Sequence, residues 1–178
     1  GAPTVAARMA WPTLGRAVVG NAEGPLGEEL DALAHRLSRR GVSILRPARP
    51  RVHPDSWRGL PLPRNCALVT DGQPLELSLK DMPHRRAPQA LEAAFATMGA
   101  RSTLMPMRMG ASTPAYLEGR DIALAGHDIL IGHGGQGTNA AGIAWLRRQL
   151  PGQRILALRL ASPFRHLSQV LSMPTPDV

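Results

Sequence analysis

The chain has 178 residues, enough for one domain with a buried core, and its 43% hydrophobic and 19% charged residues exclude a disordered protein. A single cysteine, Cys66, excludes an internal disulfide framework and favours a reducing, cytoplasmic location. The formal charge of +8 raises nucleic acid as a partner, but scattered arginines and 3% aromatic residues argue against it. No apolar run reaches membrane-spanning length, so no membrane partner is expected.

The first predicted elements are a strand, a helix and a second strand. Residues 14–19 are expected to form a strand, and residues 25–40 an amphipathic helix with its leucines on one face. Gly41 is a natural stop for this helix, and residues 42–45 form the second predicted strand. Residues 46–63 are rich in proline and arginine and are expected to be a loop.

A hairpin, a helix and a strand are predicted next. Residues 66–70 and 75–79 flank Asp71-Gly72, a pair that favours a type I′ turn. Residues 88–98 are expected to be helical and residues 102–107 to form a strand.

The same order of elements recurs in the last third of the chain. Two apolar runs, 122–124 and 129–131, flank a Gly-His turn and predict a second hairpin. Residues 140–150 carry apolar side chains at helical spacing after Thr138-Asn139, both of them N-cap candidates. Residues 155–160 then form a predicted buried strand.

These elements divide the chain into repeats of one unit, a hairpin followed by a helix and a strand. The first copy is partial, because it has a strand, a helix and a strand without a hairpin. The expected boundaries within a single, partial domain of residues 1–178 are 11–65, 66–116, 117–161 and the opening hairpin of a fourth unit at 162–178. Such a unit cannot bury its faces alone and must pack against its neighbours. The predicted fold class is therefore α/β, with repeated ββαβ units.

A glycine-rich loop gives an alternative interpretation. Residues 132–137 read Gly-His-Gly-Gly-Gln-Gly, the fingerprint of a dinucleotide-binding loop. That fingerprint requires an acidic residue at the end of the next strand, where this chain has Ala161-Ser162-Pro163-Phe164. A tight turn is the preferred interpretation and a dinucleotide-binding domain the alternative. No histidine or cysteine pair has metal-ligand spacing, so neither a metal nor another cofactor is expected.

Acidic and imidazole side chains lie at the ends of predicted strands. Glu118 and Asp121 precede the second hairpin, and His166 follows the last strand. A carboxylate and an imidazole at such positions suit acid/base chemistry. Each also has a simple structural explanation: an ion pair for Glu118, a hairpin cap for Asp121 and a turn for His166.

The segment from Leu117 to Ser168 resembles the guanidino-group-modifying enzymes of the pentein fold. It is most similar to the glycine and inosamine-phosphate amidinotransferases, whose order is an acid-x-x-Asp motif, a hairpin, a loop ending Thr-Asn, a Gly-Ile-x-Trp-Leu-Arg-Arg helix and a His-x-Asp motif. This chain has Thr138-Asn139, the helix motif at residues 142–148, and His166. Upstream, Trp11 to Gly20 resembles the opening strand of the family, and Pro63-Arg64-Asn65 lies where the family has Pro-Arg-Asp.

The resemblance implies a pentein-type α/β propeller, incomplete in this chain, and an amidinotransferase-like enzyme. Such an enzyme moves an amidino group from arginine or a related guanidino donor to an amine acceptor through a covalent cysteine intermediate. Glu118 falls on the catalytic carboxylate and His166 on the general acid/base. The positions that the resemblance assigns to substrate binding are Arg64, Asn65, Asp121 and Ser168. Association into homo-oligomers is also expected.

Three departures from the family pattern bear on activity. Asn65 replaces an aspartate that binds the guanidinium, and Ser168 replaces a second aspartate. The cysteine nucleophile belongs to a C-terminal module that we expect this chain to lack, and Cys66 lies at the wrong position. The chain itself is therefore expected to be inactive, although the complete protein would be an enzyme.

Two further functions remain open at this point: a non-catalytic pentein-like protein that binds a small molecule or a partner, and a guanidino hydrolase of the deiminase or dimethylarginine hydrolase type. If the family geometry holds, Glu118 and His166 should approach within roughly 7 Å.

Overall fold

A computed structural model of the chain describes residues 16–19, 24–47, 63–70, 73–80, 89–97, 99–109 and 113–173. Some predictions lie outside these ranges: the start of the first strand, most of the 46–63 loop, the Asp71-Gly72 turn, the outermost residues of the 88–98 helix, and residues 174–178.

The N-terminal elements are a strand, a helix and a strand, as predicted. β1 (Arg16–Val18) and β2 (Ser43–Leu45) pair in parallel, and α2 (Gly24–Ser38) connects them. Leu30 and Ala34 on one face of α2 are buried against Val19. Gly41 follows the helix with φ of 81°, a left-handed conformation that glycine adopts without strain.

The middle elements form a three-stranded sheet with order β3-β4-β5. β3 (Ala67–Thr70) and β4 (Gln73–Glu76) are antiparallel, and after α3 (Gln89–Thr97) the short β5 (Thr103–Leu104) pairs in parallel with β4. The predicted strand at 102–107 is only partly a strand. Met105 N still donates to the carbonyl oxygen of Glu76, but the next carbonyl on that side, that of Ser78, accepts from Leu117 N instead. An unpredicted hairpin follows, with β6 (Arg108–Met109) antiparallel to β7 (Thr113–Pro114).

The third group of elements has the same topology as the second. β8 (Ile122–Ala125) and β9 (Asp128–His133) form the predicted hairpin, α4 (Ala140–Gln149) follows, and β10 (Arg154–Arg159) pairs in parallel with β9. The order of elements therefore matches the predicted hairpin–helix–strand unit. The described part of the last segment, residues 162–173, contains the 3-10 helix η5 (Leu167–Gln169) and no strand, so the predicted opening hairpin is not seen there.

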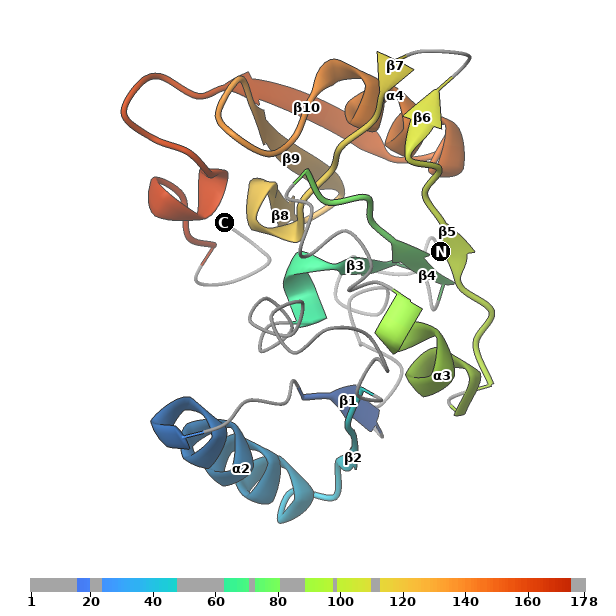
Figure 1. The fold of residues 1–178 in the computed structure, drawn as a ribbon, viewed down its shortest axis with the longest axis vertical. Helices are drawn as coiled ribbons and strands as arrows, with labels where there is room; N and C mark the ends of the chain where they lie inside the picture. The colour runs from blue at the N-terminus through green and yellow to red at the C-terminus, as the bar shows by residue number, and fades with distance from the viewer. Residues whose placement is uncertain are drawn as a thin grey trace, which may run out of the picture.

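The chain is a mixed α/β protein, as predicted. Figure 1 shows β1, α2 and β2 at one end of the long axis, the β3–β5 sheet with α3 in the middle, and the β8–β10 sheet with α4 at the other end. The described strands form four separate sheets of two or three strands. Among the described residues there is therefore no single continuous parallel sheet of the kind that the dinucleotide-binding alternative requires. None of these sheets closes into a ring within the described residues.

The main apolar core joins the middle and third groups and so positions the site between them. Leu75 and Leu77 of the middle group belong to the same buried cluster as Ile131 and Leu146 of the third group. On β10, by contrast, Leu156 and Leu158 remain exposed. Within the described part of the chain, no helix combines the length and the apolar character that a bilayer span requires.

Candidate functional site

Glu118 and Asp121 bracket a tight turn that is buried against an earlier part of the chain. The 3-10 helix η4 (Gly119–Asp121) follows Glu118, and only 3% of Glu118 and 1% of Asp121 are exposed. A Cβ at position 119 would lie 1.7 Å from the carbonyl oxygen of Arg64, so only glycine allows this contact. The turn is therefore packed onto η2 (Pro63–Asn65), the segment that precedes β3.

The Asp121 carboxylate is fully engaged by protein donors. Its Oδ2 accepts from the backbone N–H of Thr138 at 3.1 Å and from the Thr138 hydroxyl at 2.8 Å. Its Oδ1 accepts from the backbone N–H of Leu167 at 3.1 Å and lies 3.2 Å from His166 Nδ1. Asp121 therefore connects the glycine loop to the segment after β10, and its carboxylate has little capacity left for a substrate.

His166 is fixed at both its backbone and its ring. Gln169 Oε1 accepts from the backbone N–H groups of Arg165, at 2.7 Å, and of His166, at 3.0 Å. The ring presents Nδ1 to Asp121, and the same nitrogen lies 3.9 Å from Glu118 Oε2. This separation is within the roughly 7 Å that the sequence predicted for Glu118 and His166. The structure thus places these two side chains together, although their roles stay a prediction.

The glycine loop packs against the carboxylates. A Cβ at Gly137 would lie 2.8 Å from Glu118 Cδ and 2.9 Å from Asp121 Oδ2. A Cβ at Gly135 would lie 2.2 Å from the carbonyl oxygen of Arg165. These glycines therefore allow close approach to the site as well as turning. Of the two N-cap candidates, Asn139 caps α4 by accepting from Gly142 N at 3.0 Å, which leaves Thr138 for Asp121.

An arginine of the same turn forms an ion pair with Glu118. Arg120 Nη2 lies 2.8 Å from Glu118 Oε2, with 38% of the Arg120 side chain exposed. Arg120 Nε is buried and has no hydrogen-bond partner among the described residues. No sequence motif pointed to a role for Arg120.

The remaining predicted substrate-binding residues lie at the edge of this cluster. Arg64 and Ser168 are exposed, so the structure does not bring their side chains into the buried group. Asn65 is half-buried beside Gly119, and its Oδ1 is buried with no hydrogen-bond partner in the described part of the chain. Thr138 is a buried site residue whose role the sequence analysis missed.

Cys66 is not poised to act as a nucleophile. It is 0% exposed and packs with Leu79, Leu91 and Phe95. Burial, and secondarily the negative charge of Glu118, raises the pKa of its thiol to about 12, although Arg120 opposes the shift. The thiolate, which is the reactive form, is therefore almost unpopulated at neutral pH. Among the described residues, no group of three or more histidine, cysteine, aspartate or glutamate side chains could hold a metal ion.

Comparison with known proteins identifies the fold. No protein-family model matches the chain, and a search of curated proteins gives no significant match. Among solved structures, the chain is similar to a dimethylarginine dimethylaminohydrolase, with 19% identity and a TM-score of 0.65 over 86% of this chain and 63% of the other. It is also similar to an amidinotransferase of saxitoxin biosynthesis from Microseira wollei, with 20% identity and a TM-score of 0.61 over 82% and 59%. This chain has the pentein fold.

A third pentein structure, an arginine dihydrolase of the ornithine–ammonia cycle in Cyanobacteria, has 15% identity and a TM-score of 0.63 over 85% of this chain and 23% of its own. The pentein chain described here therefore spans less than two thirds of the length of each of these three proteins.

Proposed function

We propose that this chain carries the carboxylate and acid/base half of a guanidino-modifying active site, in an amidinotransferase-like enzyme. The observation that supports this most strongly is the buried meeting of Glu118 and His166, with His166 Nδ1 3.9 Å from Glu118 Oε2. The names of the similar proteins add support, because they are a dimethylarginine hydrolase, an amidinotransferase and an arginine dihydrolase.

Asp121 acts as a positioning residue in this proposal. When the imidazole donates Nδ1–H to Asp121, the ring is held in one tautomer and Nε2 becomes the atom that exchanges a proton with the reactants. This is a different role from the substrate contact that the family resemblance implied for Asp121.

The reaction has two halves. In the first, Glu118 stabilises the positive charge of the guanidino group while a thiolate attacks its central carbon. A carbon–sulfur bond forms, the bond to the departing amine breaks, and the doubly protonated ring of His166 gives its Nε2 proton to that amine. In the second half, His166 takes a proton from the acceptor, whose nitrogen or oxygen displaces the thiolate. An amine acceptor gives amidino transfer, and water gives hydrolysis.

The thiolate of this proposal comes from outside the 178 residues, because Cys66 is the one cysteine among them and is buried and protonated. We also propose that the units 11–65, 66–116 and 117–161, with the beginning of a fourth at 162–178, form part of a propeller. The strands of the second and third units share one topology, which supports this division.

Transfer is preferred to hydrolysis because the α4 motif at residues 142–148 resembles that of the amidinotransferases. Asn65 favours a second candidate, a non-catalytic protein that binds a small molecule. A neutral amide stands there in place of a carboxylate, and its Oδ1 is buried without a partner among the described residues. Loss of that charge weakens the binding of a buried cation.

Binding of L-arginine to the chain, followed by NMR, tests the proposed half-site. We expect Glu118→Gln to weaken this binding by about tenfold or more, since it removes the charge that faces the guanidinium. The matched control is Glu28→Gln on the exposed surface of α2, which should bind like the wild type. Equal affinities of the wild type and Glu118→Gln would refute the assignment of Glu118.

A further inference from the structure

The carboxylate that the proposed function assigns to a substrate guanidinium already holds one. Arg120 Nη2 lies 2.8 Å from Glu118 Oε2, a charge-assisted hydrogen bond between a guanidinium and a carboxylate. Building on the proposed function, we infer that Arg120 is a resident guanidinium that occupies the substrate subsite and sets its affinity. A guanidino compound must displace the Arg120 side chain before it can bind.

The site has one carboxylate charge that is available to compensate a cation, that of Glu118. Glu118 is 3% exposed, and its Oε2 faces both Arg120 and His166. The second carboxylate, Asp121, is already saturated by Thr138, His166 and Leu167. Two guanidinium groups next to a single buried carboxylate would leave one positive charge without compensation, which is costly. Arg120 and an external guanidinium therefore compete.

The seated position of Arg120 is also one that the side chain can leave. Arg120 lies in the three-residue turn η4, and 38% of its side chain is exposed, so a rotation carries the guanidinium into solvent. Its Nε is buried without a hydrogen-bond partner among the described residues, which disfavours the seated position because that group has lost its water. The hydrogen bond to Glu118 therefore holds the Arg120 side chain in place, while the buried Nε without a partner works against that position.

Removal of the Arg120 charge should increase the affinity of the site for an external guanidinium, and binding measurements can test this. Arg120→Met removes the charge and keeps the apolar stem, which frees Glu118 for an external cation. We expect it to bind methylguanidinium about 10- to 100-fold more tightly than the wild type, the range of one hydrogen bond to a charged group. Arg120→Lys keeps a cation beside Glu118 and should remain weak. N-methylurea, a neutral analogue, should gain nothing in the Arg120→Met variant.

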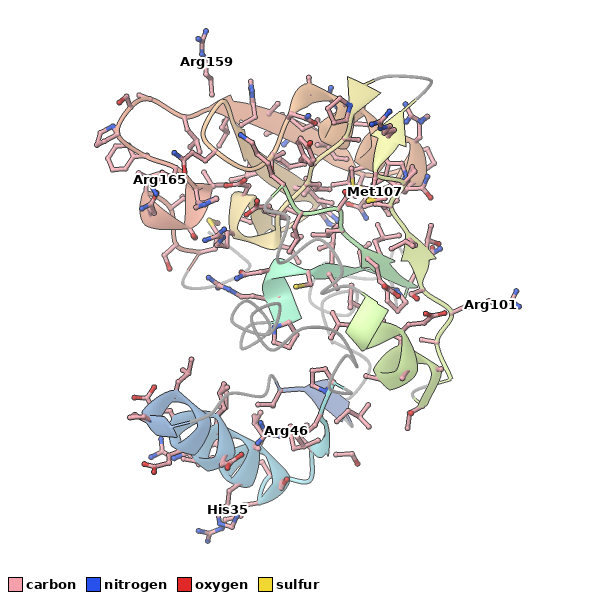
Figure 2. The ribbon with its side chains drawn as sticks, in the orientation of Figure 1. His35, Arg46, Arg101, Met107, Arg159 and Arg165 are labelled. Atoms are coloured by element: carbon pink, nitrogen blue, oxygen red, sulfur yellow. The ribbon has the colours of Figure 1, made fainter. Side chains whose placement is uncertain are left out.

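The matched control for net charge is Arg101→Met. Arg101 is exposed and, as Figure 2 shows, points away from the molecule on a different side from η5 and Arg165. This variant should bind methylguanidinium like the wild type. Far-UV circular dichroism shows whether each variant is folded. Arg120→Gln takes the place of Arg120→Met if the latter does not fold, with the same expected direction.

The outcomes separate this inference from the proposed function. If the wild type and Arg120→Met bind equally, and Glu118→Gln weakens both, Arg120 is no competitor and the proposed function stands. If Arg120→Met binds less tightly than the wild type, Arg120 is part of the binding site and the inference is wrong. If neither protein binds the cation at tens of millimolar, both the inference and the assignment of Glu118 fail. Tighter binding by Arg120→Met alone, abolished again by Glu118→Gln, supports both.

Discussion

Replacement of Asp121 by asparagine should destabilise the fold strongly, because four donors converge on its carboxylate. Each carboxylate oxygen accepts from one backbone N–H group, that of Thr138 on Oδ2 and that of Leu167 on Oδ1. Asparagine has only one acceptor oxygen, so in either orientation its amide N–H₂ faces a buried backbone N–H. One donor is then left without an acceptor, and the remaining bonds lose the charge that strengthens them.

The magnitude follows from these two losses. A buried donor without a partner costs about 1–3 kcal/mol, and a hydrogen bond to a charged group contributes about 1.5–3 kcal/mol. We expect Asp121→Asn to lower the free energy of unfolding by about 2–5 kcal/mol, a large part of the 5–15 kcal/mol that is typical of a whole domain.

Urea denaturation followed by circular dichroism measures this loss. Urea is preferred to guanidinium chloride, because guanidinium is an analogue of the proposed ligand. The matched control is Asp31→Asn, which removes an exposed ion pair with Arg46 and should cost about 0–1 kcal/mol. If Asp121→Asn costs no more than Asp31→Asn, the hydrogen-bond network does not hold the site together and the reasoning is refuted.

Three further predictions concern buried groups. At pH 8, native Cys66 should react with a thiol reagent at least about 1000-fold more slowly than urea-unfolded protein, because its pKa of about 12 lies roughly three units above the ordinary value of 9.0; equal rates would contradict this burial. Burial raises the pKa of Glu76 despite the hydrogen bond from Ser102, with a further contribution from the charge of Glu92. The folded state therefore holds the Glu76 proton more tightly than the unfolded state does. The stabilisation that this proton gives to the fold is present below the ordinary pKa of 4.5 and is lost as the pH rises through the raised value. Glutamine has no proton to lose, so the free energy of unfolding of Glu76→Gln, measured in urea, should increase relative to that of the wild type as the pH rises from 4.5 through the raised pKa. A difference between the two proteins that does not change with pH would refute the raised pKa of Glu76. Gly137→Ala should destabilise the protein by about 1–3 kcal/mol and weaken L-arginine binding, because the new Cβ would collide with Glu118. The control is Gly152→Ala, whose new Cβ meets no atom within 4 Å. Equal effects of the two substitutions would rule out the steric argument.

Local signals explain which parts of the fold were predictable. The helix α4 has apolar residues at helical spacing between a capping Asn139 and a stop at Pro151-Gly152, and it was found almost to the residue. The hairpin of β8 and β9 is set by the Gly126-His127 turn, with Gly126 in a left-handed conformation. In both elements, neighbouring residues specify the structure.

Short strands were less predictable because distant pairing defines them. β5 consists of Thr103 and Leu104, and it is a strand because it lies beside β4. The hairpin of β6 and β7 was missed, as only two residue pairs form it. A two-residue strand has no periodicity that a sequence pattern can show.

The site was found only in part. Family resemblance selected Glu118 and His166, which the structure places together. The importance of Thr138 depends on its contact with Asp121, 17 residues away, and no spacing rule predicts that contact. The contact between Arg120 and Glu118 was easier to predict, because the two residues lie two positions apart in one acid-x-x-Asp segment. An arginine between two acids was the available signal.

A crystal structure of the Arg120→Met variant with L-arginine would show directly whether the Glu118–His166 cluster binds a guanidino group. We expect the guanidino group of the ligand to lie within hydrogen-bonding distance, about 3 Å, of the Glu118 carboxylate and next to the His166 ring. Asp121 should keep its contacts with Thr138 and Leu167. A ligand bound elsewhere, or a Glu118 carboxylate that the ligand does not contact, would contradict the assignment of this cluster as a guanidino site.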